Sequence, residues 1–228
     1  MFHIQFPEPF APMTFQMRVY VPPHPLIKHW LAIARQSSTP SGIFRTAMTE
    51  LGRWLTYEAI RDWLPTQDTT IETPLAPCPA TFVNPEVPLM MVPVLRAGLA
   101  LLDGAQSLLP LASVYHLGFV RNEETLEASC YLNKLPQKLD PQTRVLIPEP
   151  MLATGGTMIA VMSELTSRGI DPANVRVIAV VTAPPALQKL SVAYPGLTIY
   201  AAAIDEQINE HGFIVPGLGD AGDRTFGT

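Results

Sequence analysis

Apolar residues follow two periods along this chain, and the two periods alternate from about residue 89 to residue 203. Short continuous apolar runs are typical of strands whose two faces are both covered by helices. Apolar residues at intervals of three and four are typical of amphipathic helices. The runs predict strands at residues 89–95, 113–120, 144–147, 175–181 and 197–203. The stripes predict helices at residues 25–35, 39–63, 99–109 and 185–193.

Strands that alternate with helices at this spacing predict an α/β fold. Its central sheet is expected to be mostly parallel, flanked by helices and built with right-handed crossovers. Ligands of such sheets bind at the carboxyl ends of the strands. Arg96, Arg121 and Glu149 each lie just past such an end. These three residues are therefore candidates for a ligand site.

The segment from Val145 to Thr157 joins a strand end to a glycine-rich turn. It begins as an apolar run, passes the acidic Glu149, turns on residues 154–156 (TGG), and continues as a helix that Gly169 is placed to end. A glycine-rich loop at a helix N-terminus offers free N–H groups and the positive end of the helix dipole to an anion. The acidic side chain is suited to hold a sugar diol or a metal ion. Neither common phosphate-loop motif is present, so the turn alone leaves open an ordinary strand-to-helix connection.

Four stretches lack a clear period. Residues 1–24 are rich in proline and phenylalanine, and either pack as an extended arm on a neighbouring subunit or fray. Residues 64–88 carry six prolines, which predicts a short edge strand at residues 69–72 and then an irregular excursion. Residues 130–135 are expected to return as a hairpin arm. The tail, residues 205–228, is either a mobile end or, as its glycines favour, a lid over the site.

The composition of the 228 residues excludes several classes of protein. Apolar residues make up 47%, which is enough for a full core, and the net charge of −5 argues against binding of nucleic acid by a basic face. No apolar run approaches the roughly 18 residues that span a membrane, and the N-terminus lacks the pattern of a signal peptide. Cys78 and Cys130 have no metal-ligand spacing and are expected to be free thiols in the cytoplasm.

Four motifs then coincide in one order along the chain. They are residues 93–99 (PVLRAGL), 121–125 (RNEET), 150–156 (PMLATGG) and 217–224 (GLGDAGDR). Together they resemble the uracil phosphoribosyltransferase family, and the resemblance extends from about Val21 to the C-terminus. It implies one phosphoribosyltransferase-like domain over residues 21–228, with a protruding hairpin arm and a C-terminal hood from about residue 204. Residues 1–20 are expected to form an N-terminal extension.

The resemblance also implies an activity, the formation of uridine monophosphate (UMP) from uracil and phosphoribosyl pyrophosphate (PRPP) in pyrimidine salvage. It implies catalytic roles for Arg96, Arg121 and Asp220. PRPP is expected to contact these three residues and the loop Glu149, Pro150, Met151, Leu152, Ala153, Thr154, Gly155, Gly156 and Thr157. Uracil is expected to contact Ile214, Gly219, Asp220 and Ala221. Mg²⁺ is expected as a cofactor held mainly by the substrate's diphosphate, without a direct protein ligand. A homodimer or higher homo-oligomer and activation by GTP are further expectations.

The chain departs from the family's pattern in the phosphate loop. The family usually has Asp where this chain has Glu149, an apolar residue at Pro148, and Ser at Thr157. The longer carboxylate could be displaced by ~1 Å, which can cost as much as a hundredfold in rate. This departure keeps open a catalytically weak nucleotide-binding regulator as the alternative to a working enzyme. A transferase for another base is a third hypothesis, which the motif Gly219-Asp220-Ala221 argues against.

Overall fold

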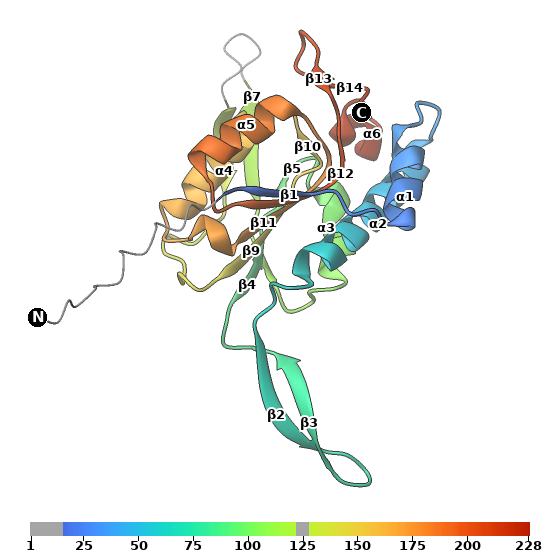
Figure 1. The fold of residues 1–228 in the computed structure, drawn as a ribbon. Coiled ribbons are helices and arrows are strands. Elements are labelled where there is room, and N and C mark those ends of the chain that lie inside the picture. Colours follow the sequence, from blue (N-terminus) through green and yellow to red (C-terminus); the bar gives the residue numbers. More distant parts are fainter. Residues whose placement is uncertain (1–15, 122–127) are drawn as a thin grey trace, which may run out of the picture.

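The central layer of the molecule is a seven-stranded sheet (Figure 1). The computed structural model describes residues 16–121 and 128–228. The strand order is β1–β12–β11–β9–β4–β6, with β10 paired to β11, and all of these pairings are parallel. The strands are β1 (Arg18–Tyr20), β4 (Leu89–Met91), β6 (Ser113–Val114), β9 (Arg144–Pro148), β10 (Met151–Leu152), β11 (Val175–Thr182) and β12 (Thr198–Ile204). The predicted parallel sheet is confirmed.

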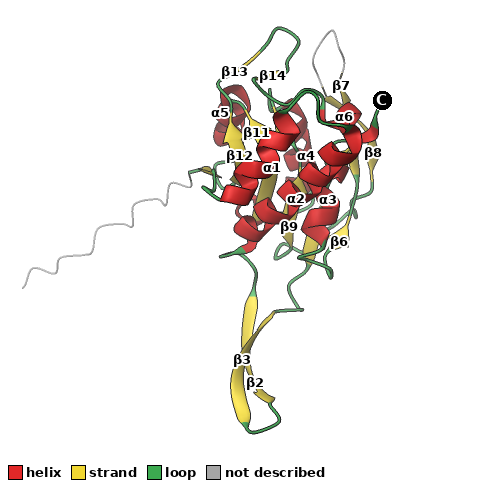
Figure 2. Ribbon diagram, turned by 90° about the vertical axis from the view of Figure 1, so that its right-hand side faces the viewer, coloured by secondary structure: helices red, strands yellow, loops and turns green. Residues whose placement is uncertain are grey.

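Helices cover both faces of this sheet (Figures 1 and 2). One face carries α1 (Pro25–Arg35), α2 (Ser41–Ile60) and α3 (Leu99–Gln106), and the other carries α4 (Gly156–Thr166) and α5 (Pro184–Ala193), with a short 3₁₀ helix, η1 (Pro172–Asn174), before β11. Side chains of β11 alternate between two cores, because successive strand residues face opposite ways. Val177 and Ala179 belong to the core under α4 and α5, whereas Ile178 and Val180 belong to the core under the other three helices. No helix in the described part of the chain is long and apolar enough to cross a membrane.

Two predicted strands are divided in the structure. The apolar run at residues 89–95 forms β4 and then β5 (Val94–Leu95), which belongs to a second sheet with β7 (Leu117–Arg121) and β8 (Ala128–Asn133). The run at residues 113–120 is likewise shared between β6 and β7. Pro93 lies at the first break, and a proline cannot donate a hydrogen bond to a neighbouring strand. The prediction of continuous strands here was wrong, because an apolar run does not show which sheet each part joins.

Residues 64–88 also differ from the prediction. They contain an antiparallel ribbon, β2 (Thr66–Glu72) and β3 (Pro77–Val83), which projects from the end of the molecule opposite the C-terminal residues (Figures 1 and 2). A two-stranded ribbon has two free edges, so Pro77 and Pro79 fit where a central strand would not accept them. Thr73 closes the turn by accepting hydrogen bonds at its hydroxyl from the N–H groups of Leu75 and Ala76. The expected irregular excursion is therefore an ordered arm.

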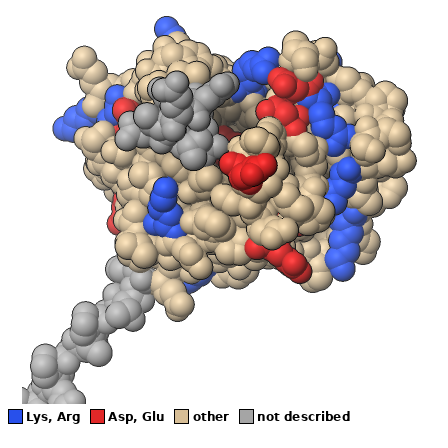
Figure 3. Space-filling model, turned by 90° about the horizontal axis from the view of Figure 1, so that it is seen from above, with Lys and Arg blue, Asp and Glu red and all other residues tan. Residues whose placement is uncertain are grey.

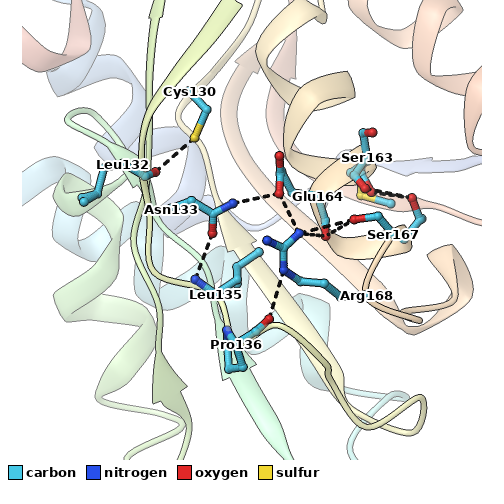
Figure 4. A network of polar contacts seen from close by, with 11 residues as sticks. Cys130, Leu132, Asn133, Leu135, Pro136, Ser163, Glu164, Ser167 and Arg168 are labelled. Atoms are coloured by element: carbon cyan, nitrogen blue, oxygen red, sulfur yellow. Dashed lines mark hydrogen bonds and ion pairs between the residues drawn. The ribbon is translucent and has the colours of Figure 1, made fainter.

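The predicted hairpin arm near residues 130–135 is confirmed as β7 and β8. A polar network joins the end of β8 to α4 (Figure 4). Glu164 accepts hydrogen bonds from the amide of Asn133 at 2.8 Å and from the guanidinium of Arg168 at 2.6 Å. The same guanidinium donates to the carbonyl of Pro136 at 3.0 Å. The arm is therefore fixed at its base to the helix that follows the glycine-rich turn. The predicted charged loop after Arg121 lies outside the described residues.

The tail is ordered and folds back over the α1 side of the sheet. It consists of β13 (Gln207–Ile208), β14 (Ile214–Val215) and α6 (Ala221–Phe226), and we call residues 204–228 the hood. Asp205 is buried and binds the Arg35 guanidinium at 2.6 and 2.9 Å, while it accepts the Gly217 N–H at 2.9 Å. Arg224 donates to carbonyl groups at the end of α1 and lies 4.2 Å from the centre of the Phe44 ring. These contacts favour the hood over the alternative of a mobile end.

The predicted N-terminal extension is described only in its last residues. Residues 18–20 form the edge strand β1, which pairs with β12, so this part of the extension belongs to the sheet. Residues 1–15 lie outside the described part.

Candidate active site

The sheet reverses its direction of growth between β4 and β9. From β4 the chain crosses through α3 to β6 at one edge, and from β9 it crosses through α4 to β11 on the other side. At such a switch point the loops diverge and leave a crevice at the carboxyl ends of the strands. The two loops touch at their bases, since a Cβ on Gly98 would lie 2.5 Å from the carbonyl oxygen of Pro148. The topology therefore brings the turn of Arg96 beside Glu149.

A cavity of about 130 Å³ lies in the loop after β9. Gly155 precedes α4 with a φ of 79°, in the left-handed region that residues with a side chain rarely adopt. The first N–H groups of α4 have no acceptor within the helix and carry the positive end of its dipole. The cavity is lined by Glu149, Met151, Leu152, Ala153, Thr154, Gly155, Gly156, Thr157 and Met158. An anion held there would be bound mainly by backbone groups. Pro150, also predicted for this loop, lies in the turn between β9 and β10.

Glu149 lines the same cavity and is only 8% exposed. Burial raises the pKa of its carboxyl from 4.5 to about 8, against a smaller opposite effect of the N–H of Met151, which donates to it at 3.4 Å. The carboxyl is therefore mostly protonated at pH 7. Hydroxyl groups that donate to the carboxylate would favour its charged form. Binding of a diol here would thus be coupled to release of a proton.

Arg96 follows β5 and is half exposed at the rim of the crevice. One of its terminal nitrogens donates to a carboxylate oxygen of Asp223 at 2.8 Å, and the other lies 3.5 Å from the hydroxyl of Thr228. The guanidinium carbon lies 5.9 Å from the centre of the Phe226 ring. The view from above the hood shows acidic and basic side chains side by side on this end of the molecule (Figure 3). The cation is thus available to an anionic ligand.

The hood supplies the other predicted side of the site. Ile214 and Ala221 are buried, whereas Gly219 and Asp220 are exposed. Asp220 precedes α6, and its carboxylate accepts the N–H of Asp223 at 2.8 Å. The predicted uracil residues thus lie in one connected segment that runs from β14 to the first residue of α6.

Arg121, the other predicted arginine, ends β7, and its backbone pairs with Ala128. Its side chain lies outside the described part of the structure.

Sequence reasoning missed the partners that hold these residues. Asp223 lies in the last of the four motifs, but its contact with Arg96 joins residues that are 127 positions apart. Asp205 and Arg35 are 170 positions apart. Local patterns of hydrophobicity carry no signal for such pairs.

Three features meet at the switch point of the parallel sheet: a helix N-terminus with a glycine turn, an acidic residue and an arginine. This arrangement is typical of a protein that binds a phosphorylated ligand. Comparison with known proteins identifies the family. The family model described as uracil phosphoribosyltransferase matches residues 21–228. The chain belongs to the uracil phosphoribosyltransferase family.

Individual relatives agree with the family model. Uracil phosphoribosyltransferase from Nostoc sp. is 72% identical over 216 residues, which are 95% of this chain and 100% of the relative. The enzyme of the same name from Nicotiana tabacum is 55% identical over 93% of this chain and 95% of its own length. The structure of the AQ2163 protein from Aquifex aeolicus is 36% identical and superposes with a TM-score of 0.80, covering 91% of this chain and 97% of that one.

Proposed function

We infer that this protein is a uracil phosphoribosyltransferase, a pentosyltransferase that converts uracil and PRPP into UMP and pyrophosphate. The observation that carries this conclusion is the arrangement of the phosphate loop, the Arg96 turn and the hood around one switch point, in a chain of this family. The family evidence favours the enzyme over a catalytically weak regulator. Salvage of uracil into the nucleotide pool fits this reaction.

We propose the following roles for the residues of the site. The N–H groups of the loop at residues 153–157 hold the ribose 5-phosphate, and Glu149 faces the ribose hydroxyls. Arg96 and Arg121 bind the diphosphate. Main-chain groups of Ile214 and of the segment at residues 219–221 read the edge of uracil. These assignments are supported by the cavity in the loop and by the position of the hood.

The reaction breaks the bond between the anomeric carbon and the diphosphate oxygen and forms a bond from that carbon to a uracil nitrogen, whose N–H bond breaks and whose proton is released to solvent or to the leaving pyrophosphate. The electron pair of the broken bond leaves with pyrophosphate, through a transition state with oxocarbenium character. No covalent nucleophile is required. Catalysis comes from holding the two substrates in line and from neutralising the leaving group. Loss of one such charge contact typically lowers the rate by ~10²–10³.

We also propose Mg²⁺ as the cofactor, bound mainly to the diphosphate of PRPP. When bound, the ion neutralises part of the negative charge of the leaving group. Within the described residues no cluster of three or more histidine, cysteine or acidic side chains offers a metal cage. Mg²⁺ commonly keeps several waters and is held by substrate phosphates with one or two carboxylates. The exposed carboxylate of Asp220 is suited to meet the ion or one of its waters.

An assay of UMP formation from uracil and PRPP tests the function. We expect turnover by the wild-type protein, and a large loss of turnover with a higher KM for PRPP in Arg96→Ala. Arg61→Ala is a matched control, since Arg61 is an exposed arginine just past the end of α2, at the end of the molecule that carries the β2–β3 arm. The absence of UMP at micromolar enzyme would contradict the proposal. Faster product formation from orotate or hypoxanthine would assign a different base.

We propose that the protein works as a homodimer or higher homo-oligomer. The β2–β3 arm leaves apolar side chains in solvent, with Leu75 96% exposed and Phe82 50% exposed. A two-stranded ribbon alone is at best marginally stable in water, so the arm is expected to pack on a second copy. Sedimentation of the wild-type protein and of a variant with residues 67–82 replaced by a short turn tests this. A wild-type monomer would contradict it.

Two further proposals rest on the resemblance to the family and on the cysteines. GTP is proposed as an activator, and titration of the assay with GTP tests it. A cytoplasmic location is proposed because Cys78 and Cys130 are both free, as is usual for thiols in a reducing compartment. Fractionation of the source cells tests the location.

A further inference from the structure

The ion pair between Arg96 and Asp223 joins the two halves of the site. Arg96 lies in the turn between β5 and α3, whereas Asp223 lies in α6 of the hood. The hydroxyl of Thr228 donates to the same Asp223 carboxylate oxygen at 3.2 Å, and the Phe226 ring lies near the guanidinium. Side chains of the hood therefore surround a residue of the diphosphate side.

The pair is also linked to Asp220, a hood residue that we propose contacts uracil. The N–H of Asp223 is held by the carboxylate of Asp220 at 2.8 Å. A Cβ on Gly222 would lie 3.2 Å from this Asp220 carboxylate and 3.8 Å from a terminal nitrogen of Arg96. A chain of contacts thus runs from Arg96 through Asp223 to Asp220. Two hydrogen bonds therefore connect the Arg96 guanidinium to the Asp220 carboxylate by way of Asp223.

The fold of the hood does not depend on this pair. Arg224 donates to the carbonyl groups of Leu218 and Gln36 at 2.7 Å, and Arg45 donates to the carbonyl of Thr225 at 3.0 Å. On the other side, Asp205 and its partners fix the hood's first strand to α1. The Asp223 side chain is 49% exposed and that of Arg96 is 54% exposed. The role of the ion pair between Arg96 and Asp223 therefore lies in the site and not in folding.

We propose that Asp223 is a positioning residue, which orients the Arg96 guanidinium for the diphosphate and couples that orientation to the hood. The proposal rests on the function inferred above. A guanidinium has five N–H donors, and the contacts with Asp223 and Thr228 leave the remaining donors for a ligand. Exposed ion pairs are weak, so the contact guides Arg96 without preventing its movement when a ligand binds. Binding of diphosphate and ordering of the hood should then favour each other.

Asp223→Ala tests the proposal in two measurements on the full-length protein. We expect the KM for PRPP to rise about two- to fivefold, the range that the loss of an exposed ion pair supports, with a smaller change in kcat. Calorimetric titration with magnesium diphosphate, which needs no turnover, should show weaker binding by a similar factor. Asp223→Asn keeps an oxygen that can accept from Arg96, so it should restore most of the loss.

Glu210→Ala is the matched control, because Glu210 is a hood residue that is 87% exposed and its partner is the neighbouring His211. It removes the same charge without touching Arg96 and should leave both measurements unchanged. A lower KM in either Asp223 variant would show that Asp223 competes with the diphosphate, and would overturn the proposal. Unchanged KM and unchanged diphosphate binding in Asp223→Ala would also overturn it. Absence of UMP formation by the wild-type protein would instead refute the inferred function, while the diphosphate titration would still decide the role of Asp223.

Discussion

The buried Glu149 makes the stability of this protein depend on pH in a defined way. Its pKa is raised by burial to about 8, against 4.5 for the free side chain. Below pH 4.5 the carboxyl is neutral in both the folded and the unfolded protein, and burying it carries no charge penalty. As the pH rises from 4.5 to 8, the unfolded chain releases the proton while the folded protein keeps it. The free energy of unfolding therefore falls across this window. Above pH 8 the contribution of protonated Glu149 to stability is lost.

The size of the effect follows from the two pKa values. The full difference of 3.5 pH units corresponds to about 5 kcal/mol. Between pH 5.5 and pH 7.5, the linkage relation gives a loss of about 2–3 kcal/mol from this single group. Gln has the shape of the neutral carboxylic acid and does not titrate. Glu149→Gln should therefore lose about 2–3 kcal/mol less than the wild-type protein between these two pH values.

Urea unfolding at pH 5.5 and 7.5, at one fixed protein concentration, measures this difference. Tryptophan fluorescence can follow it, since Trp54 and Trp63 lie within or against the core. Other titrating groups contribute equally to the two proteins and cancel. Glu210→Gln removes an exposed carboxyl and should follow the wild-type curve. Parallel losses in wild type and Glu149→Gln would refute the reasoning, because they would show that the buried carboxyl does not hold its proton.

Three further substitutions test the supports of the site. Gly98→Ala places a Cβ 2.5 Å from the carbonyl oxygen of Pro148; we expect urea unfolding to show a loss of about 1–3 kcal/mol, and wild-type stability would contradict the close contact. Glu164→Gln weakens the anchor of β8 on α4, so steady-state kinetics should show a two- to fivefold higher KM for PRPP with little change in kcat; an unchanged KM would separate the arm from the site. Asp205→Asn weakens the buried pair with Arg35 and should cost about 3 kcal/mol, with the KM for uracil rising more than that for PRPP; equal stability would mean that the hood has other sufficient anchors.

Local features of this fold were predictable from the sequence because short-range physics decides them. The helix at residues 25–35 was predicted with the bounds that α1 has in the structure. The apolar run of β11 and the glycine turn before α4 were equally clear, since each depends on residues close together in the chain. The proximity of the Arg96 turn to the loop of Glu149 also followed, because a parallel sheet fixes where its loops gather.

The errors in the prediction share a physical cause. Continuous strands were expected at residues 89–95 and 113–120, yet the chain changes sheet within each of them. The sheet that a strand joins depends on which distant strand it pairs with, and an apolar run is equally compatible with both sheets. The β2–β3 arm was missed because prolines exclude a central strand but not a ribbon with two free edges. The pair of Arg96 and Asp223 likewise exists only after the hood folds back on the sheet.

The departure at Pro148 and Glu149 is less disruptive than the sequence suggested. The N–H of Glu149 donates to the carbonyl of Ile178 in β11 at 3.1 Å. On one side, the carbonyl of Leu146 in β9 accepts the N–H of Val92, just past the end of β4, at 2.9 Å. On the other side, β9 stays paired with β11 through Pro148, so the backbone of Glu149 keeps its register. Any kinetic difference between the wild-type protein and Glu149→Asp then reports the extra methylene and the buried carboxyl's proton, and not a displaced strand.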